Sequence, residues 1–447
     1  MMLHTSPMET QRRASFEQHS QDVLNLLGAG HQLTRAEIAS RLGVTRTTIT
    51  PVLSQLHDEG AIVTVATQSG EGRGRRAAIL AIDPTAVRHI GVDMSHTRVI
   101  VILANNAGTE IVSGMKEFQA GATWESRCTT AIKFIQTLVS SHELHLRQLS
   151  RIAIGLPGSA SWHFGFSEEN YPAVFPSRAE LKAESRTQVM QDSANDTRLR
   201  VTQIFAEEFH VPVATAHHIR YAAIAEAANH PSAENLLYVR LSSGVGGAVI
   251  DCGKAVVGAA KLAGEIGHMC VDHSDNAPLC RCGKRGCLEA FISITALENS
   301  WRKAGHPKDT FADLCEAAHQ DNPERRTNPG NSSRTSRLPD SNRRAQEIVV
   351  QAAKTLGRAI GCAAVVTDPD SIVISGEVGN LLLTQQEVIQ TEVDKEILPV
   401  AQSRVCAASV GFKAGAVGAV IASMSEANTA STPSTPPNLI NPRIYDT

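Results

Sequence analysis

The sequence predicts an α/β protein in which a small winged helix-turn-helix domain precedes a larger two-lobed domain. Two short amphipathic helices on either side of a glycine turn occupy residues 34–58, and a hairpin-like alternating run follows them. From residue 89 onward, strand-like runs alternate with helices, and the order strand–turn–strand, helix, strand occurs twice. The 447 residues exceed what one ordinary core accommodates, so we expect two or three domains.

The composition argues against a protein that coats nucleic acid and against a membrane-spanning or secreted protein. A net charge of −3 argues against wholesale coating of nucleic acid, although a local basic surface remains compatible with it. We find neither an apolar run of membrane-spanning length nor a signal peptide, and we therefore expect a cytoplasmic protein with no membrane partner. The nine cysteines are an odd number, which indicates reduced thiols together with a metal site.

The N-terminal part, residues 19–84, is predicted to bind DNA, and the polar residues 1–18 before it are expected to be disordered. Thr34 and Glu37 form a capping box at the start of a helix that ends at Gly43. A second helix opens near Thr45, although Pro51 is expected to kink it or to delay its start. Its exposed face would present to DNA the residues Arg46, Thr47, Thr48 and Thr50.

The next stretch alternates like a β-hairpin and has a glycine-rich tip. The tip carries Arg73, Arg75 and Arg76, which could reach the phosphate backbone or the minor groove. A winged helix that binds double-stranded DNA is therefore expected. The alternative is a small helical adaptor with a solvated basic loop.

The larger domain is expected to span residues 88–423. Two of its segments, the polar insertion 321–344 and the tail 424–447, are expected to be disordered. Strands are predicted near residues 89–95, 98–104, 110–114, 151–156, 211–215 and 236–256, and helices near residues 123–141, 199–209 and 218–229, with a further long helix after residue 344.

The loop 264–290 contains a cysteine cluster with the spacing C-x-C-x₄-C. Cys280, Cys282 and Cys287 can wrap three thiolates around one tetrahedral zinc ion, and His268 is the expected fourth ligand. Cys270 and His273 compete for that fourth position, and reduced cysteines in a loop are the alternative. Four protein ligands would leave no open position, so the zinc would be structural.

Two carboxylates flank these ligands. Glu265 and Glu289 beside a glycine-rich turn suit the vicinal hydroxyls of a sugar, although two ordinary surface glutamates would have the same spacing.

The motifs GEIGH and CRCGKRGCLEA behind a winged helix resemble those of the ROK family of sugar-responsive repressors and sugar kinases. The resemblance implies a two-lobed, actin-like ATPase fold and a structural zinc held by the histidine and three cysteines named above. It also implies that Glu265, Glu289 and His268 face the sugar, and that Gly158 lies in the turn at the rim of the sugar cleft.

The features that a kinase of this family needs look altered. Its first phosphate loop resembles D-x-G-G-T, whereas this chain has side chains at both glycine positions, Ser95 and His96. His217 and His218 stand where an Asn-Asp pair with the catalytic aspartate is expected, either as helix-cap or as ligand-contact residues. The second loop keeps Gly244, Gly246 and Gly247, which also suit a plain hairpin turn. We therefore expect no enzymatic activity.

Two imidazoles in place of the Asn-Asp pair also affect the choice of ligand. They favour a sugar acid, a phosphorylated sugar or a larger glycan, or a loss of ligand binding, and a protonated His217 or His218 could pair with an anionic group. The sequence thus predicts a transcriptional repressor, homodimeric or homotetrameric, that releases its operator when a sugar or sugar derivative binds. The alternatives are a sugar kinase with an appended DNA-binding domain, and a constitutive DNA-binding protein whose second domain only serves oligomerisation.

Overall fold

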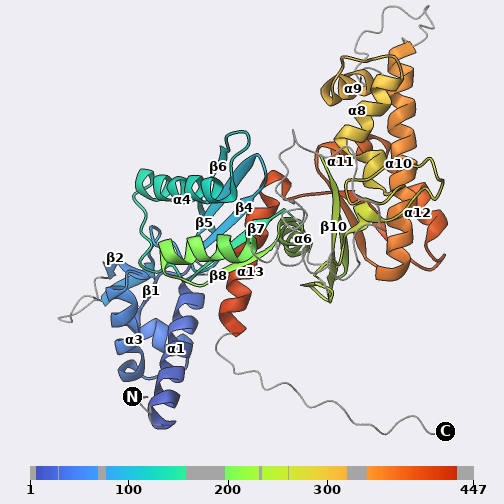
Figure 1. Ribbon diagram of the computed structural model, residues 1–447. Helices are drawn as coiled ribbons and strands as arrows, with labels where there is room; N and C mark the ends of the chain where they lie inside the picture. Colours follow the sequence, from blue (N-terminus) through green and yellow to red (C-terminus); the bar gives the residue numbers. More distant parts are fainter. Residues whose placement is uncertain are drawn as a thin grey trace, which may run out of the picture.

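The computed structural model describes residues 7–28, 30–68, 77–157, 197–230, 234–259, 261–319 and 340–429. They form a small N-terminal domain followed by two lobes that lie side by side (Figure 1). The first lobe adjoins the N-terminal domain, and the C-terminal helix α13 (Ala414–Thr429) returns to pack between the lobes.

The N-terminal domain contains three helices and a three-stranded sheet. The capping box of Thr34 and Glu37 is confirmed, since each side chain bonds the backbone N–H of the other residue. The domain's core includes Ile38, Ile49 and Leu53. Its elements are α1 (Pro7–Gly28), β1 (Leu33–Thr34), α2 (Arg35–Arg41), α3 (Arg46–Asp58), β2 (Ile62–Gln68) and β3 (Ala77–Ile82), with the sheet order β1-β3-β2.

Two local expectations for this domain, disorder before residue 19 and a delayed start of the second helix, are wrong. Residues 7–18 are helical rather than disordered, because Pro7 suits a first helical turn, no glycine interrupts the segment and Phe16 packs against the domain core. Helix α3 starts at Arg46 and continues through Pro51. The proline removes only the hydrogen bond to the carbonyl of Thr47, which lies on the exposed side, while the opposite side of α3 stays buried.

The two lobes repeat one topology, as the duplicated order of elements predicts. Each sheet has three antiparallel strands followed by two parallel ones. The first sheet has the order β6-β5-β4-β7-β8, with β4 (His89–Met94), β5 (Arg98–Ala104), β6 (Glu110–Glu117), β7 (Arg151–Leu156) and β8 (Val213–His217). The second has the order β11-β10-β9-β12-β13, with β9 (Leu236–Leu241), β10 (Val245–Asp251), β11 (Lys254–Ala255), β12 (Ser371–Ser375) and β13 (Arg404–Ala407).

Helices cover these sheets. In the first lobe, α4 (Trp124–Ser141) and the helix at residues 197–209 contribute Ile135 and Phe205 to the core. The second lobe contains η3 (Ile266–His268), α7 (Glu289–Ile292), α8 (Ile294–Lys303), α9 (Phe311–His319), α10 (Asp340–Thr367), α11 (Glu377–Leu382), η5 (Leu383–Gln385) and α12 (Gln386–Glu396). Helix α10 is long and apolar enough to cross a membrane by length and composition, but 56% of its apolar window is buried in this lobe, as a core helix requires.

Two further expectations of disorder are corrected at helix ends. Residues 340–344 form the first turns of α10, where Asn342 is buried and Arg344 Nη1 donates to Ala304 O at 2.6 Å. Residues 424–429 continue α13 (Ala414–Thr429), whose Met424 packs against Gly108. Both segments are ordered by tertiary contacts that their polar composition does not reveal. The remainder of the insertion and of the tail lies outside the described residues.

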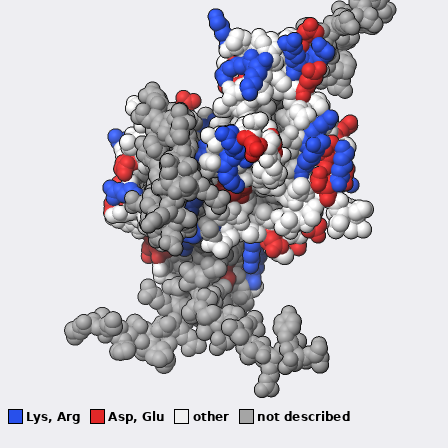
Figure 2. All heavy atoms as spheres, turned by 45° about the vertical axis from the view of Figure 1, so that its right-hand side comes forward, with Lys and Arg blue, Asp and Glu red and all other residues white. Residues whose placement is uncertain are grey.

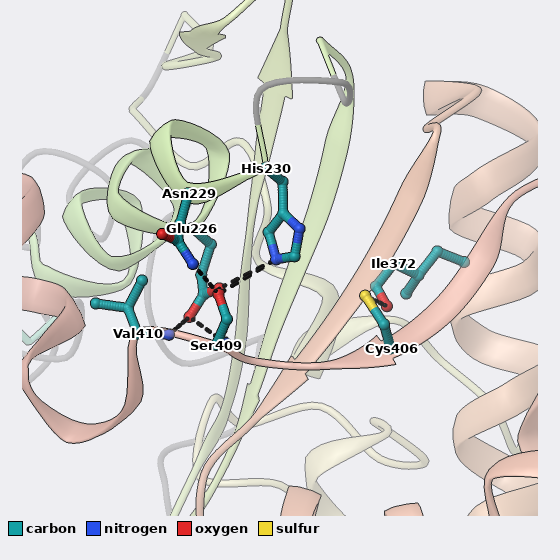
Figure 3. Close-up of polar contacts among 7 residues, drawn as sticks. All are labelled: Glu226, Asn229, His230, Ile372, Cys406, Ser409 and Val410. Atoms are coloured by element: carbon teal, nitrogen blue, oxygen red, sulfur yellow. Dashed lines mark hydrogen bonds and ion pairs between the residues drawn. The ribbon is translucent and has the colours of Figure 1, made fainter.

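Helix α6 (His218–Asn229) packs on α13 between the lobes (Figure 1). Gly418 lets α13 lie directly on the backbone of α6 at Tyr221, where any side chain would collide. At the other end of α6, the fully buried carboxylate of Glu226 accepts hydrogen bonds from the N–H groups of Ser409 and Val410 at 2.9 Å and from Ser409 Oγ at 2.7 Å (Figure 3). These bonds tie α6 to η6 (Gly411–Lys413) and α13.

The N-terminal domain rests on the first lobe. Gln148 Nε2 donates to Glu59 O at 2.9 Å, and His145 Nε2 lies 3.3 Å from Asp83 Oδ2. Gly28 at the end of α1 lies against Ala107 of the β5–β6 turn. The two domains therefore contact each other directly.

Candidate functional site

The described residues include one compact group of metal-ligating side chains. The ligand atoms of His268, Cys280, Cys282 and Cys287 all lie within 4.8 Å of one another. Gly283 and Gly286 have positive φ, which permits the tight turns of the loop. Cys270 and His273, the competitors for the fourth position, lie outside this group and contact each other at 3.5 Å.

The geometry of the group fits a tetrahedral ion. His268 Nδ1 is 3.6 Å from Cys280 Sγ, and the same distance separates the Sγ atoms of Cys282 and Cys287. Two thiolates bound to one zinc at about 2.3 Å lie about 3.8 Å apart in a tetrahedron, so these spacings need little change. Hydrogen bonding with Cys280, followed by that with His268, lowers the pKa of Cys282, which favours the thiolate form that binds zinc.

Glu289 lies beside this group, and its carboxylate is bound by other groups of the protein. It is buried at the start of α7, and Arg281 binds both of its carboxylate oxygens, at 2.7 and 2.8 Å. The backbone N–H of Val245 donates to Oε2 at 2.9 Å. Gly244 leaves the space that the Arg281 guanidinium occupies, because a side chain there would collide with it. The carboxylate expected to face a ligand is therefore neutralised by an arginine from the cysteine motif itself.

Glu265 has a different environment. It precedes η3 and is half-buried, and burial raises the pKa of its carboxyl group above the usual value. Its charge interacts with those of Arg198, from the helix at 197–209, and Arg220, from the first turn of α6. Arg220 Nη2 donates to Lys261 O at 3.3 Å, which holds its guanidinium beside the loop that carries Glu265.

The two adjacent histidines have distinct roles. His217 caps α6, because its Nδ1 accepts the N–H of Ile219 at 3.2 Å, and burial lowers its pKa well below the usual value. His218 Nδ1 lies 3.2 Å from Oδ1 of the buried Asp93. Asp93 carries a lowered pKa because hydrogen bonding and the charge of His218 outweigh its desolvation. The imidazole expected to meet a ligand thus contacts the first phosphate-loop aspartate.

The turn after β4, where the resemblance places the first phosphate loop, is closed by its own side chains. Ser95 Oγ accepts the N–H groups of Thr97 at 3.3 Å and of Arg98 at 3.0 Å, so it occupies the backbone donors of this turn. His96 packs near the Trp124 ring, with centroids 6.1 Å apart, and its Nδ1 lies 3.3 Å from Arg127 Nη1. A phosphate would have to displace the Ser95 hydroxyl to reach these amides.

The residues predicted to contact DNA are only partly described. Arg46, Thr47, Thr48 and Thr50 all lie exposed on α3, the second helix of the helix-turn-helix. Thr45 caps this helix and also hydrogen-bonds the hydroxyls of Thr47 and Thr48, each at 2.8 Å. The wing residues Arg73, Arg75 and Arg76 lie outside the described residues, as does Gly158.

The comparison with known protein families identifies both parts of the chain. Residues 17–69 match the Crp-like helix-turn-helix domain. Residues 89–425, three quarters of the chain, match the ROK family. The chain belongs to the ROK family. The resemblance carried by the GEIGH and cysteine motifs is therefore confirmed.

Relatives of this ROK protein include named regulators. The DNA-binding transcriptional dual regulator NagC of Escherichia coli K12 is 25% identical over 407 residues, which cover 89% of this chain and 86% of NagC. The xylose repressor of Bacillus spizizenii is 25% identical over 292 residues, 64% of this chain and 68% of the repressor.

Solved structures confirm the fold of this ROK protein. A ROK family transcriptional regulator homologous to the E. coli MLC protein superposes with a TM-score of 0.62 at 17% identity, covering 92% of this chain and 97% of that one. The ROK hexokinase of Thermus thermophilus superposes with a TM-score of 0.56 at 20% identity over 76% of this chain and 99% of the hexokinase. The helix-turn-helix followed by an actin-like sugar-kinase fold is thereby established.

Sequence reasoning missed three features of the site. The pairing of Arg281 with Glu289 and of His218 with Asp93, and the approach of Arg198 and Arg220 to Glu265, join residues from separate elements. The one available signal was the basic residue between the first two cysteines of the motif.

On the face shown in Figure 2, basic and acidic side chains are interspersed, as the small net charge leads one to expect.

Proposed function

We propose that this ROK protein is a cytoplasmic transcriptional repressor that binds an operator through α3 and the wing and is controlled by a sugar or sugar derivative. The observation that carries the proposal is the direct connection of an exposed, capped recognition helix to a ROK domain. The naming of its relatives as regulators supports the same function.

The state of the kinase machinery favours a regulator over an enzyme. Phosphoryl transfer needs backbone amides for the phosphates and an aspartate that takes the proton from the attacking hydroxyl. Here Ser95 occupies two of those amides, and His218, paired with Asp93, stands where the aspartate is expected. The runner-up, a sugar kinase with an appended DNA-binding domain, requires both features to work.

The proposed effector site lies around Glu265 and His268, with Glu289, Arg281, His217 and His218 as its further surroundings. We propose that His268 and the three cysteines hold a structural zinc ion, which would fix the loop that carries both glutamates. Effector binding would shift the population of lobe arrangements and with it the placement of two winged helices. Half-sites on DNA recur about every 34–36 Å, so a homodimer or homotetramer must space its recognition helices to match.

The test combines DNA binding with enzymology. The purified zinc-loaded chain is titrated onto DNA fragments from upstream of its own and neighbouring genes, with and without sugars such as xylose and N-acetylglucosamine. Specific binding that one sugar weakens at least tenfold supports the proposal. Phosphate transfer from Mg-ATP to a sugar would instead establish the kinase, and DNA binding unaffected by every sugar would favour a constitutive DNA-binding protein.

A further inference from the structure

Two arginines approach Glu265, and one of them, Arg220, has a buried N–H without a partner among the described residues. Arg198, Arg220 and Glu265 interact electrostatically with one another in all three pairs. Arg220 uses Nη2 to bind Lys261 O, whereas its Nε is buried and has no hydrogen-bond partner among the described residues. A buried guanidinium N–H without an acceptor is costly, and a bound acceptor would remove that cost.

Among the residues that the structure describes, the charges around this position do not balance. Arg281 is matched by the two oxygens of Glu289, which leaves the two other guanidinium groups facing one carboxylate, Glu265. Arg198 and Arg220 also repel each other, because both are positively charged and partly desolvated. An anion at this position would be stabilised by both.

The adjacent histidines cannot supply this positive charge. His217 accepts a hydrogen bond through Nδ1 and is buried among positive groups, so it stays neutral at pH 7. His218 faces Asp93 instead. An anionic ligand, which the two imidazoles suggest, must therefore be bound by other positively charged groups. Arg198 and Arg220 are such groups.

We propose that the effector of this protein is an anionic sugar derivative whose carboxylate or phosphate group is bound by Arg220 and Arg198 while Glu265 accepts its hydroxyl groups. The planar fork of a guanidinium matches both kinds of anion, and each such charged hydrogen bond is stronger than a neutral one. This inference rests on the proposed function, because it assigns the class of ligand to the same effector site.

The experiment compares matched ligands on the full-length, zinc-loaded chain. Glucose, glucuronate and glucose 6-phosphate form one set, and galactose, galacturonate and galactose 6-phosphate form a second. Calorimetry gives the affinity of each, inorganic phosphate tests the anion position alone, and release of bound DNA reports the response. The variants are Arg220→Gln and Arg198→Gln, with Arg302→Gln as control because that surface arginine pairs only locally with Glu298. The melting temperature shows whether each variant folds.

An anionic member of a set should bind at least tenfold more tightly than its neutral parent. Arg220→Gln or Arg198→Gln should reduce this preference to less than threefold, and Arg302→Gln should leave it unchanged. The carboxylate and phosphate arms decide which anion is used. A neutral sugar that binds as tightly as its anionic derivatives overturns the inference while sparing the proposed function. The inference is also overturned if none of the sugars binds and inorganic phosphate does not raise the melting temperature of the protein. Failure to bind any DNA would instead overturn the proposed function.

Discussion

His218 Nδ1 lies 3.2 Å from Asp93 Oδ1, and this contact joins the start of α6 to the end of β4. Both side chains are largely buried, so each compensates the polarity of the other. We therefore expect the pair to contribute to the stability of the fold.

Replacement of His218 should distinguish this role from a ligand contact. His218→Asp places a second carboxylate beside Asp93, and like charges at this distance oppose each other. We expect it to lower the free energy of unfolding by about 2–4 kcal/mol, and His218→Asn by less, since an amide can still donate to Asp93. Urea denaturation at pH 7 measures both, and equal losses would show that the charge of residue 218 does not matter.

Loss of one cysteine should release the metal. Cys282→Ser removes a thiolate from the tetrahedral group, so we expect bound zinc to fall from about one equivalent per chain to much less than half. Elemental analysis of the purified protein and its melting temperature before and after chelation are the measurements. Cys252→Ser is the matched control, because Cys252 is exposed and lies outside the group. Wild-type protein without zinc would contradict the assignment.

A double-mutant cycle tests the pairing of Arg281 with Glu289. Arg281→Met leaves the buried carboxylate without its bidentate partner, while Glu289→Gln removes the charge and keeps the shape. Because Arg281 is partly exposed, we expect a coupling energy of about 1–2 kcal/mol, near the lower range for buried charge pairs. Purely additive losses would mean that the two side chains do not interact in solution.

The stability of the protein should depend on His89 between about pH 6.5 and pH 4. Burial lowers the pKa of His89 from 6.5 to about 4, and its Nδ1 lies 3.0 Å from Ser423 Oγ of α13. The unfolded chain thus binds a proton in this range while the folded chain does not, so stability falls as the pH falls. The full contribution is about 3 kcal/mol. His89→Gln should flatten the pH dependence of the unfolding free energy, and an unchanged slope would refute the assignment.

Much of the fold is predictable from the sequence because it depends on local patterns. Periodicity and turn residues indicate the strands of the first sheet and β9 and β10 of the second, and Thr34 and Glu37 indicate the start of α2. The short strand β13 is not predicted. The expectations of disorder for residues 7–18 and 340–344 are wrong because polar composition does not show that Phe16 or Asn342 finds a buried position in the folded chain.

The candidate site is less predictable for a physical reason. The metal ligands follow one another within a short loop, so their spacing alone predicts that they meet. The contacts of Arg220 and His218 instead join residues from separate elements, and no local pattern encodes them. The partner of Asp93 lies far from it in the sequence, directly after β8, so the pairing forms only when the first sheet is assembled.

The hydrogen bonds of Glu226 have a consequence for how the two domains communicate. Helix α6 carries Arg220 near one end and Glu226 near the other, so displacing its first turn along the helix axis must either stretch the bonds to Ser409 and Val410 or pull α13 with it (Figure 3). Met424 of α13 packs against Gly108, and the methyl group of the neighbouring Ala107 lies against Gly28 at the end of α1. A continuous series of packing contacts and hydrogen bonds thus connects the end of α6 that carries Arg220, part of the proposed effector site, to α1 of the N-terminal domain.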